Sequence, residues 1–210
     1  MPHDPGGPAS GHGLRDGAVF AAQFVRSPLA TASVWPSSSA LAAAVVDAAL
    51  DGAGPEPTVL ELGAGSGAFT GALAARLRGR GRQLAVELNP VLAHRLAERV
   101  RRVEVVPADV AELPTLLACR GIRRVDVVVS GLGWSATRPG RDDSLVPVVA
   151  RCLADEGVFV QFAYTLTARA SRARALDREV RACFRRATRS PVVWRNLPPA
   201  TVHRAQGPRR

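Results

Sequence analysis

The sequence contains no lysine. All 28 basic residues are arginine, against 18 acidic residues, and the formal net charge is +10. This balance excludes an acidic disordered chain and makes an anionic partner worth testing. It does not by itself indicate nucleic acid, because an alanine-rich chain without lysine is what the codon bias of a GC-rich genome would give.

Cysteines are few, and long apolar runs are absent. Cys119, Cys152 and Cys183 are odd in number and far apart, which favours neither a disulfide framework nor a zinc site and indicates a reducing compartment. No apolar run approaches the ~18–20 residues that span a bilayer, and the N-terminus lacks the apolar core of a signal peptide. We therefore expect a cytoplasmic protein that at most rests on the cytoplasmic face of a membrane.

Residues 1–16 are rich in glycine and proline and poor in large apolar groups. Such a segment cannot bury enough surface to offset the entropy lost on ordering, so the sequence predicts a disordered tail. We expect residues 17–210 to form a single domain. Its N-terminal helical segment, 17–52, is expected to contain an apolar helix over 17–25 and a capped helix over 38–51.

From residue 58 onward, short β-branched runs alternate with helical stretches. The pattern predicts strands over 58–62, 83–88, 103–108, 125–129 and 158–164, and helices over 68–80, 90–101, 110–119, 144–154 and 169–186. Prolines between two further runs, 190–196 and 201–206, predict an antiparallel hairpin at the sheet edge. The fold class is therefore α/β: a Rossmann-like, mostly parallel seven-stranded sheet with helices on both faces.

The most informative motif is VLELGAGSGAFT, which runs from Val59 to Thr70. A predicted strand enters a turn that contains Gly63, Gly65 and Gly67, and a predicted helix follows directly. Glycine suits such a turn because the backbone bends tightly and must approach a ligand with no Cβ in the way. The helix then directs its free N–H groups towards that ligand.

Two cofactors fit this turn. The first two glycines with Ala68 satisfy the dinucleotide fingerprint, and Glu87 would bind the ribose. S-adenosylmethionine is favoured by carboxylates near three successive strand ends. Glu61 can receive the methionyl ammonium, Glu87 both ribose hydroxyls, and Asp109 the adenine amino group. A nicotinamide enzyme needs no carboxylate at the first and third of these positions.

These motifs resemble those of class I methyltransferases and, more narrowly, of the bacterial phospholipid N-methyltransferase family, which is similar to rRNA adenine dimethyltransferases. The resemblance covers about Phe20 to Arg204. The segments that carry it are FVRSPLATASVWPSSSALA (24–42), VLELGAGSGAFT (59–70), AVELNP (85–90), VVVSGL (127–132), VFVQFAY (158–164) and VWRNLPPATV (193–202).

The resemblance implies an S-adenosylmethionine-dependent enzyme that methylates an amine, such as a phospholipid head group. The residues expected to bind the cofactor are Glu61, Gly63, Ala64, Gly65, Gly67, Glu87, Leu88, Asp109, Val110 and Ser130. No metal is expected. Methyl transfer to a neutral amine is an in-line displacement that needs alignment more than acid–base help, so the lack of a His/Asp pair is no objection.

One departure from the family concerns the acceptor. The family commonly has a proline after Ser-Gly-Leu, whereas this chain has Gly133-Trp134. Adenine methyltransferases have an Asn-Pro-Pro-Tyr-like turn here, whose aromatic ring stacks on a flipped base. This chain lacks that turn, so nucleic acid is not the expected acceptor. We expect Trp134 and Tyr164 to line the acceptor pocket and Trp35 to help close it, because aromatic faces attract a methylammonium. Trp194 is expected to pack a loop onto the sheet.

The acceptor itself stays open at this point. A small soluble metabolite is the alternative to a lipid; an RNA adenine methyltransferase and a cofactor-binding enzyme that does not methylate are further alternatives. Nine arginines between Arg169 and Arg195 could hold the enzyme on anionic lipid or could simply be a solvated helix face. The four histidines, His203 in the predicted edge strand among them, are expected to be surface residues rather than ligands.

Overall fold

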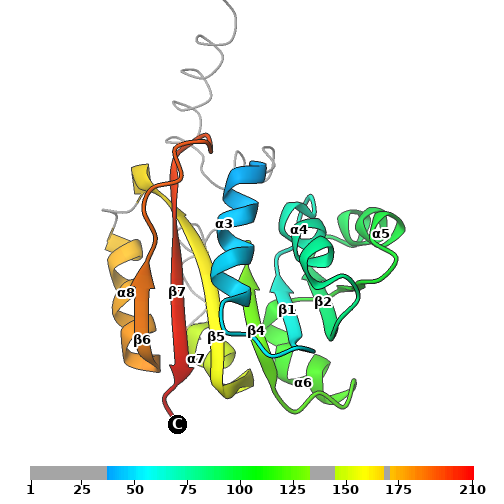
Figure 1. The fold of residues 1–210 in the computed structure, drawn as a ribbon. Coiled ribbons are helices and arrows are strands. Elements are labelled where there is room, and N and C mark those ends of the chain that lie inside the picture. Colours follow the sequence, from blue (N-terminus) through cyan, green and yellow to red (C-terminus); the bar gives the residue numbers. More distant parts are fainter. Residues whose placement is uncertain (1–36, 133–144, 168–170) are drawn as a thin grey trace, which may run out of the picture. The chain divides into compact units, whose positions relative to one another are not determined.

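The computed structural model describes residues 37–132, 145–167 and 171–210 (Figure 1). The predicted tail over 1–16, the apolar helix over 17–25, and both Trp35 and Trp134 lie outside these residues. The division into a tail and a single domain therefore stays a prediction.

The described residues form a seven-stranded sheet in the order β3-β2-β1-β4-β5-β7-β6. Its strands are β1 (Thr58–Leu62), β2 (Arg82–Glu87), β3 (Glu104–Pro107), β4 (Val125–Ser130), β5 (Leu153–Tyr164), β6 (Phe184–Arg189) and β7 (Ala200–Pro208). The first five are parallel, and β7 is antiparallel to both β5 and β6. The predicted Rossmann-like sheet with an antiparallel edge hairpin is confirmed.

Helices cover both faces of the sheet (Figure 1). They are α3 (Ser39–Leu50), α4 (Ala68–Leu77), α5 (Pro90–Arg99), α6 (Leu113–Ala118), α7 (Leu145–Cys152) and α8 (Ser171–Cys183), with short 3₁₀ turns η1 (Val110–Glu112) and η3 (Thr165–Thr167). Along β1, Val59 packs with residues of α3 and α4, whereas Leu60 and Leu62 pack with residues of α6 and α7. This alternation is what a strand buried on both faces requires.

Helix α3 begins where the sequence predicts. Ser38 is its N-cap, and the Ser38 hydroxyl accepts a hydrogen bond from the Leu41 N–H at 3.1 Å. The Ser38 N–H donates in turn to Oδ1 of Asn196 at 3.0 Å, and the Asn196 amide donates to the Pro198 carbonyl at 2.7 Å. Asn196 is buried and thus ties the loop between β6 and β7 to the start of α3.

Two predicted segments near the C-terminus are wrong in position. Helix α8 ends at Cys183 rather than near Arg186, and the first strand of the hairpin is Phe184–Arg189 rather than 190–196. Strand β6 reads FRRATR, and its arginines are exposed. Charged side chains are a common feature of edge strands, and here they remove the alternating pattern that would indicate a strand.

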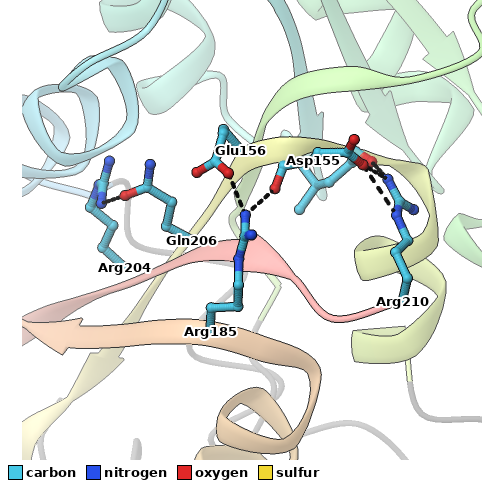
Figure 2. Close-up of polar contacts among 7 residues, drawn as sticks. Asp155, Glu156, Arg185, Arg204, Gln206 and Arg210 are labelled. Atoms are coloured by element: carbon cyan, nitrogen blue, oxygen red, sulfur yellow. Dashed lines mark hydrogen bonds and ion pairs between the residues drawn. The ribbon is translucent and has the colours of Figure 1, made fainter.

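Two arginines also contact the amino end of β5, which is the end opposite the glycine-rich turn (Figure 2). Arg210 donates to Oδ1 of Asp155 at 2.8 Å and to the Leu153 carbonyl at 3.0 Å. Arg185 reaches the Asp155 carbonyl at 2.6 Å and also pairs with Glu156. The antiparallel edge is thus joined to the parallel part of the sheet by side chains as well as by the strand ladder.

Candidate functional site

The glycine-rich turn joins β1 to α4 at the carboxyl edge of the sheet. Gly63 and Gly65 have φ values of 70° and 52°, in the left-handed region that glycine adopts readily. The Gly63 N–H donates to the Val86 carbonyl of β2 at 2.8 Å. On its other side, a Cβ on Gly131 would lie 2.5 Å from the Gly63 carbonyl oxygen. The turn is therefore held by backbone on both sides.

The third glycine of the turn serves helix packing. Gly67 is the N-cap of α4, with a φ of 80°, and a Cβ there would lie 2.3 Å from Cδ1 of Leu96 in α5. Arg99 of α5 donates a hydrogen bond to the carbonyl of Ser66 in the same turn. Close approach of the two helices at Gly67 thus sets where the turn lies.

Glu61 of β1 is fully buried, and neither oxygen of its carboxyl group has a hydrogen-bond partner among the described residues. Burial raises the pKa of Glu61 to about 8, with a smaller contribution from the charge of Glu87. Thr70 lies close enough to lower this pKa, although it makes no hydrogen bond of ordinary geometry with Glu61. A buried polar group without a partner is costly. Glu61 therefore lies in a place where a cationic hydrogen-bond donor would be favourable.

Glu87 ends β2 and braces the turn. Its Oε2 accepts a hydrogen bond from the Gly65 N–H at 2.7 Å, and its Oε1 accepts one from the Asn89 N–H at 2.9 Å. An ionised carboxylate has about four acceptor sites, so each oxygen can accept a second hydrogen bond. Leu88, next in the chain, is largely exposed at the same edge.

Asp109 lies just after β3, and Ser130 is the last residue of β4. Asp109 is the N-cap of η1, where its Oδ1 accepts from the Ala111 N–H at 2.9 Å. Val110 directs its side chain into the core. Ser130 ends β4, is buried, and accepts a hydrogen bond from the Leu132 N–H at 3.2 Å. The hydroxyl of Ser130 thus shapes the chain that leads out of β4 beside the glycine-rich turn.

Tyr164 is the last residue of β5 and is half-buried. Its ring meets that of Phe162 edge-on, with centroids 5.3 Å apart, and burial raises the pKa of its hydroxyl.

Trp194 is 76% exposed, so the prediction that it packs a loop onto the sheet is wrong. The prediction of a surface His203 in an edge strand is also wrong, because β7 lies between β5 and β6 and His203 is half-buried.

The structure brings the turn, Glu61 and Glu87 together, as the sequence predicts. The sequence assigned no role to Thr70, the last residue of the motif, which lies beside Glu61, and it missed Leu96 and Arg99, which lie against the turn from α5. The spacing of Leu96 and Arg99 from the motif carries no recognisable signal, since it depends on how the helices pack. Among the described residues, no group of three or more histidine, cysteine, aspartate or glutamate side chains could hold a metal ion.

Comparisons with known proteins agree with this geometry. Residues 59–157 match the family model described as "Methyltransferase domain". The chain is 34% identical over 152 residues to ornithine lipid N-methyltransferase of Singulisphaera acidiphila, which covers 70% of this chain and 78% of that protein.

Solved structures share the fold. The 1,6-didemethyltoxoflavin-N1-methyltransferase of Burkholderia thailandensis superposes with a TM-score of 0.60 at 22% identity, covering 97% of this chain and 93% of its own. The precorrin-6y C5,15-methyltransferase of Geobacter metallireducens gives a TM-score of 0.55 at 19% identity, covering 79% and 86%.

The methyltransferase-domain match and the 34% identical relative place this protein in the class of S-adenosylmethionine-dependent methyltransferases, with which its fold and glycine-rich turn agree. The chain belongs, within that class, to the family that includes ornithine lipid N-methyltransferase. It is an enzyme whose methyl donor is S-adenosylmethionine.

Proposed function

We propose that Glu61, Gly63, Gly65, Glu87 and Asp109 bind the methyl donor, with Ala64, Gly67, Leu88, Val110 and Ser130 completing the site. The unpartnered, fully buried carboxyl group of Glu61 supports this proposal most directly. The methionyl ammonium would give Glu61 the cationic donor that the protein itself does not supply. Glu87, already oriented by the N–H groups of Gly65 and Asn89, keeps acceptor sites for two ribose hydroxyls.

The reaction needs little from the protein beyond alignment. S-adenosylmethionine supplies an electrophilic methyl group on a sulfonium. A neutral amine would take up this methyl group through its lone pair, and the electron pair of the broken C–S bond would stay on sulfur, leaving S-adenosylhomocysteine. The product ammonium would have to release a proton to solvent before a further methyl could be added. We propose that Tyr164 and Trp134 line the acceptor pocket and that Trp35 helps close it; both tryptophans are outside the described residues. Aromatic faces stabilise a methylammonium by roughly 0.5–2 kcal/mol.

We further propose that the acceptor is the amine of a membrane lipid. The observation that carries this proposal is the distribution of exposed large apolar side chains. In the described part of the chain there are six: Leu88, Val91, Leu92, Leu166, Trp194 and Leu197. All six follow the carboxyl ends of β2, β5 or β6, or lie in the first turn of α5, so they share the sheet edge at which the glycine-rich turn lies.

Exposed apolar side chains gathered at one edge are typical of a surface that meets a protein or a membrane. Three of the six are fixed beside one another by backbone contacts: the Thr165 N–H donates to the Pro199 carbonyl at 2.9 Å, and Val193 pairs with Ala200. These contacts hold Leu166 next to the loop that carries Trp194 and Leu197.

Positive charge is present at this surface too. Arg195, between Trp194 and Leu197 in the loop after β6, is exposed, and an arginine near an anionic leaflet contributes about 1 kcal/mol. None of the described helices is both long and apolar enough to cross a bilayer. We therefore propose a peripheral contact through the carboxyl edge of the sheet, with a lipid amine as the acceptor.

Isotope-labelled S-adenosylmethionine tests this function. The enzyme is incubated with the lipid fraction and, separately, with the aqueous metabolite fraction of a bacterial extract, and the products are identified by mass spectrometry. The Glu61→Gln variant is the control for transfer that does not depend on the site. We expect label in lipid head groups. Label only in the aqueous fraction would instead indicate a small soluble acceptor.

A further inference from the structure

A row of polar side chains crosses the face of the sheet beneath α8, beside Thr201, whose hydroxyl lies 3.1 Å from Nε2 of His203. Gln161 of β5, His203 of β7 and Arg189 of β6 are directly paired in register, so their side chains lie on one face. The neighbouring row on that face contains Phe159 and Ala205, both of which are buried in the core. Core packing alone therefore does not explain the polar row.

A cavity of about 50 Å³ lies between this row and α8, which contributes Asp177 and Arg181 to its lining. A single water needs roughly 10–15 Å³ by the same measure, so the cavity can hold several waters or one tetrahedral oxyanion. It lies away from the glycine-rich turn, because none of the residues that form the turn lines it. The methyl-transfer site therefore does not account for it.

The cavity carries an excess of positive charge. Nε of Arg181 lies 2.9 Å from Oδ2 of Asp177, and a guanidinium nitrogen of Arg189 lies 3.9 Å from Oδ1 of the same carboxylate. Two guanidinium groups thus share one carboxylate. His203 adds no charge at neutral pH, because burial and then the charge of Arg189 lower its pKa to about 4. The Arg181 and Arg189 side chains are 61% and 50% exposed, so water solvates both, and an anion in the cavity would add a second charged partner beside Asp177.

The cavity also presents a hydrogen-bond acceptor. Gln161 is 4% exposed, and its Oε1 has no partner among the described residues. The fitting ligand is therefore an anion that also carries a proton to donate. Sulfate has no such proton at neutral pH, whereas hydrogen phosphate has one. We propose that this cavity binds inorganic phosphate, with Arg189 and Arg181 meeting its charge and Gln161 accepting from its hydroxyl.

Thermal unfolding at pH 7.5 and constant ionic strength tests this site without any methyl donor or acceptor. A ligand that binds only the folded state raises the unfolding midpoint with concentration. We expect inorganic phosphate to bind at least tenfold more tightly than sulfate. Arg189→Gln should weaken phosphate binding at least tenfold, whereas the matched variant Arg186→Gln, which removes the same charge from an exposed position outside the cavity, should not.

Gln161→Leu should make phosphate and sulfate bind equally, because it removes the acceptor and leaves the arginines. Because Gln161→Leu can also change the stability of the protein, a second measurement uses the wild-type protein alone. In the wild-type protein, phosphate should raise the pKa of His203, followed by NMR of the imidazole, because a nearby anion favours the imidazolium.

Equal responses to phosphate and sulfate in the wild-type protein would mean that Gln161 accepts no hydrogen bond from the ligand, and either that result or a His203 resonance that phosphate does not move would overturn the assignment. A phosphate monoester has no hydroxyl on phosphorus when it is fully ionised, and methyl phosphate has no other hydroxyl to donate. Binding of methyl phosphate as tight as that of phosphate would therefore also overturn the assignment. Each of these failures would leave the methyltransferase function untouched.

Discussion

At the scale of single residues, Glu61 links the stability of the protein to the binding of its donor. A fully buried carboxyl group with a pKa of about 8 is neutral at pH 7 in the free protein. A more stable fold would place an apolar or amide side chain there. A bound cation would stabilise the ionised carboxylate of Glu61 strongly, because opposite charges attract most in a low-dielectric site.

The free protein should lose stability as the pH rises towards 8. Glu61 has a pKa of 4.5 in the unfolded chain and about 8 in the folded protein, so folding takes up a proton between these values. The contribution of Glu61 is fully present below pH 4.5 and declines by about 1.4 kcal/mol per pH unit until the folded pKa is reached. Glu61→Gln removes this dependence.

Unfolding of wild type and Glu61→Gln at pH 5.5, 7.0 and 8.5 measures the effect. The variant should gain stability relative to wild type as the pH rises. A difference between the two proteins that does not change with pH would show that Glu61 ionises freely in the folded state.

Donor affinity should have the opposite pH dependence. If the ionised form of Glu61 receives the methionyl ammonium, binding below pH 8 must release a proton from Glu61. The dissociation constant of S-adenosylmethionine should then rise up to tenfold for each pH unit below 8, and calorimetry in buffers of different ionisation enthalpy should detect the released proton. Binding to Glu61→Gln should be weak and free of this dependence. An equally steep pH dependence in the variant would place the titrating group elsewhere.

At the scale of elements, the junction of β1 with α4 depends on a glycine whose role is packing. Gly67 has a left-handed φ, and a side chain there would meet Leu96 of α5. Gly71, one turn further along α4, has open space around its Cβ position. Gly67 thus caps α4 at a crowded position, whereas Gly71 lies within α4 at an open one.

Gly67→Ala should therefore destabilise the protein by about 1–3 kcal/mol and weaken donor binding, because strain at such positions is of that order. Gly71→Ala is the matched control and should stabilise the protein by about 0.5–1 kcal/mol, since alanine is the better helix former. Chemical denaturation and donor titration of both variants measure this. If Gly67→Ala behaved like Gly71→Ala, the close approach of α4 and α5 would be absent in solution.

The elements also show what sequence patterns can and cannot predict. Strand β1, Thr58–Leu62, was predictable to the residue, because its aliphatic residues lead directly into the glycine-rich turn. Strand β6 was not, because only Phe184 and Ala187 face inward and arginines occupy most of its other positions. The site follows the same rule. Glu61 and Glu87 stand at fixed distances from a local motif, whereas Leu96 and Arg99 reach the turn only through tertiary packing.

At the scale of the whole molecule, one edge of the sheet combines three properties. It carries the glycine-rich turn, the carboxyl groups near it, and all six exposed large apolar side chains of the described residues. The net charge of +10 alone does not distinguish nucleic acid from lipid. The position of the apolar side chains favours lipid, because nucleic-acid surfaces rely on basic and stacking groups instead.

We propose above that this edge presents the enzyme to lipid amines in a membrane. The decisive measurement is the rate of methyl transfer to one head group in two forms, as a lipid in anionic vesicles and as a soluble short-chain analogue, with wild type and a Trp194→Ser, Leu197→Ser variant. The variant should lose at least tenfold in rate on vesicles and keep its rate on the soluble analogue. An equal rate for both proteins on vesicles, or an equal loss on both substrates, would contradict this proposal.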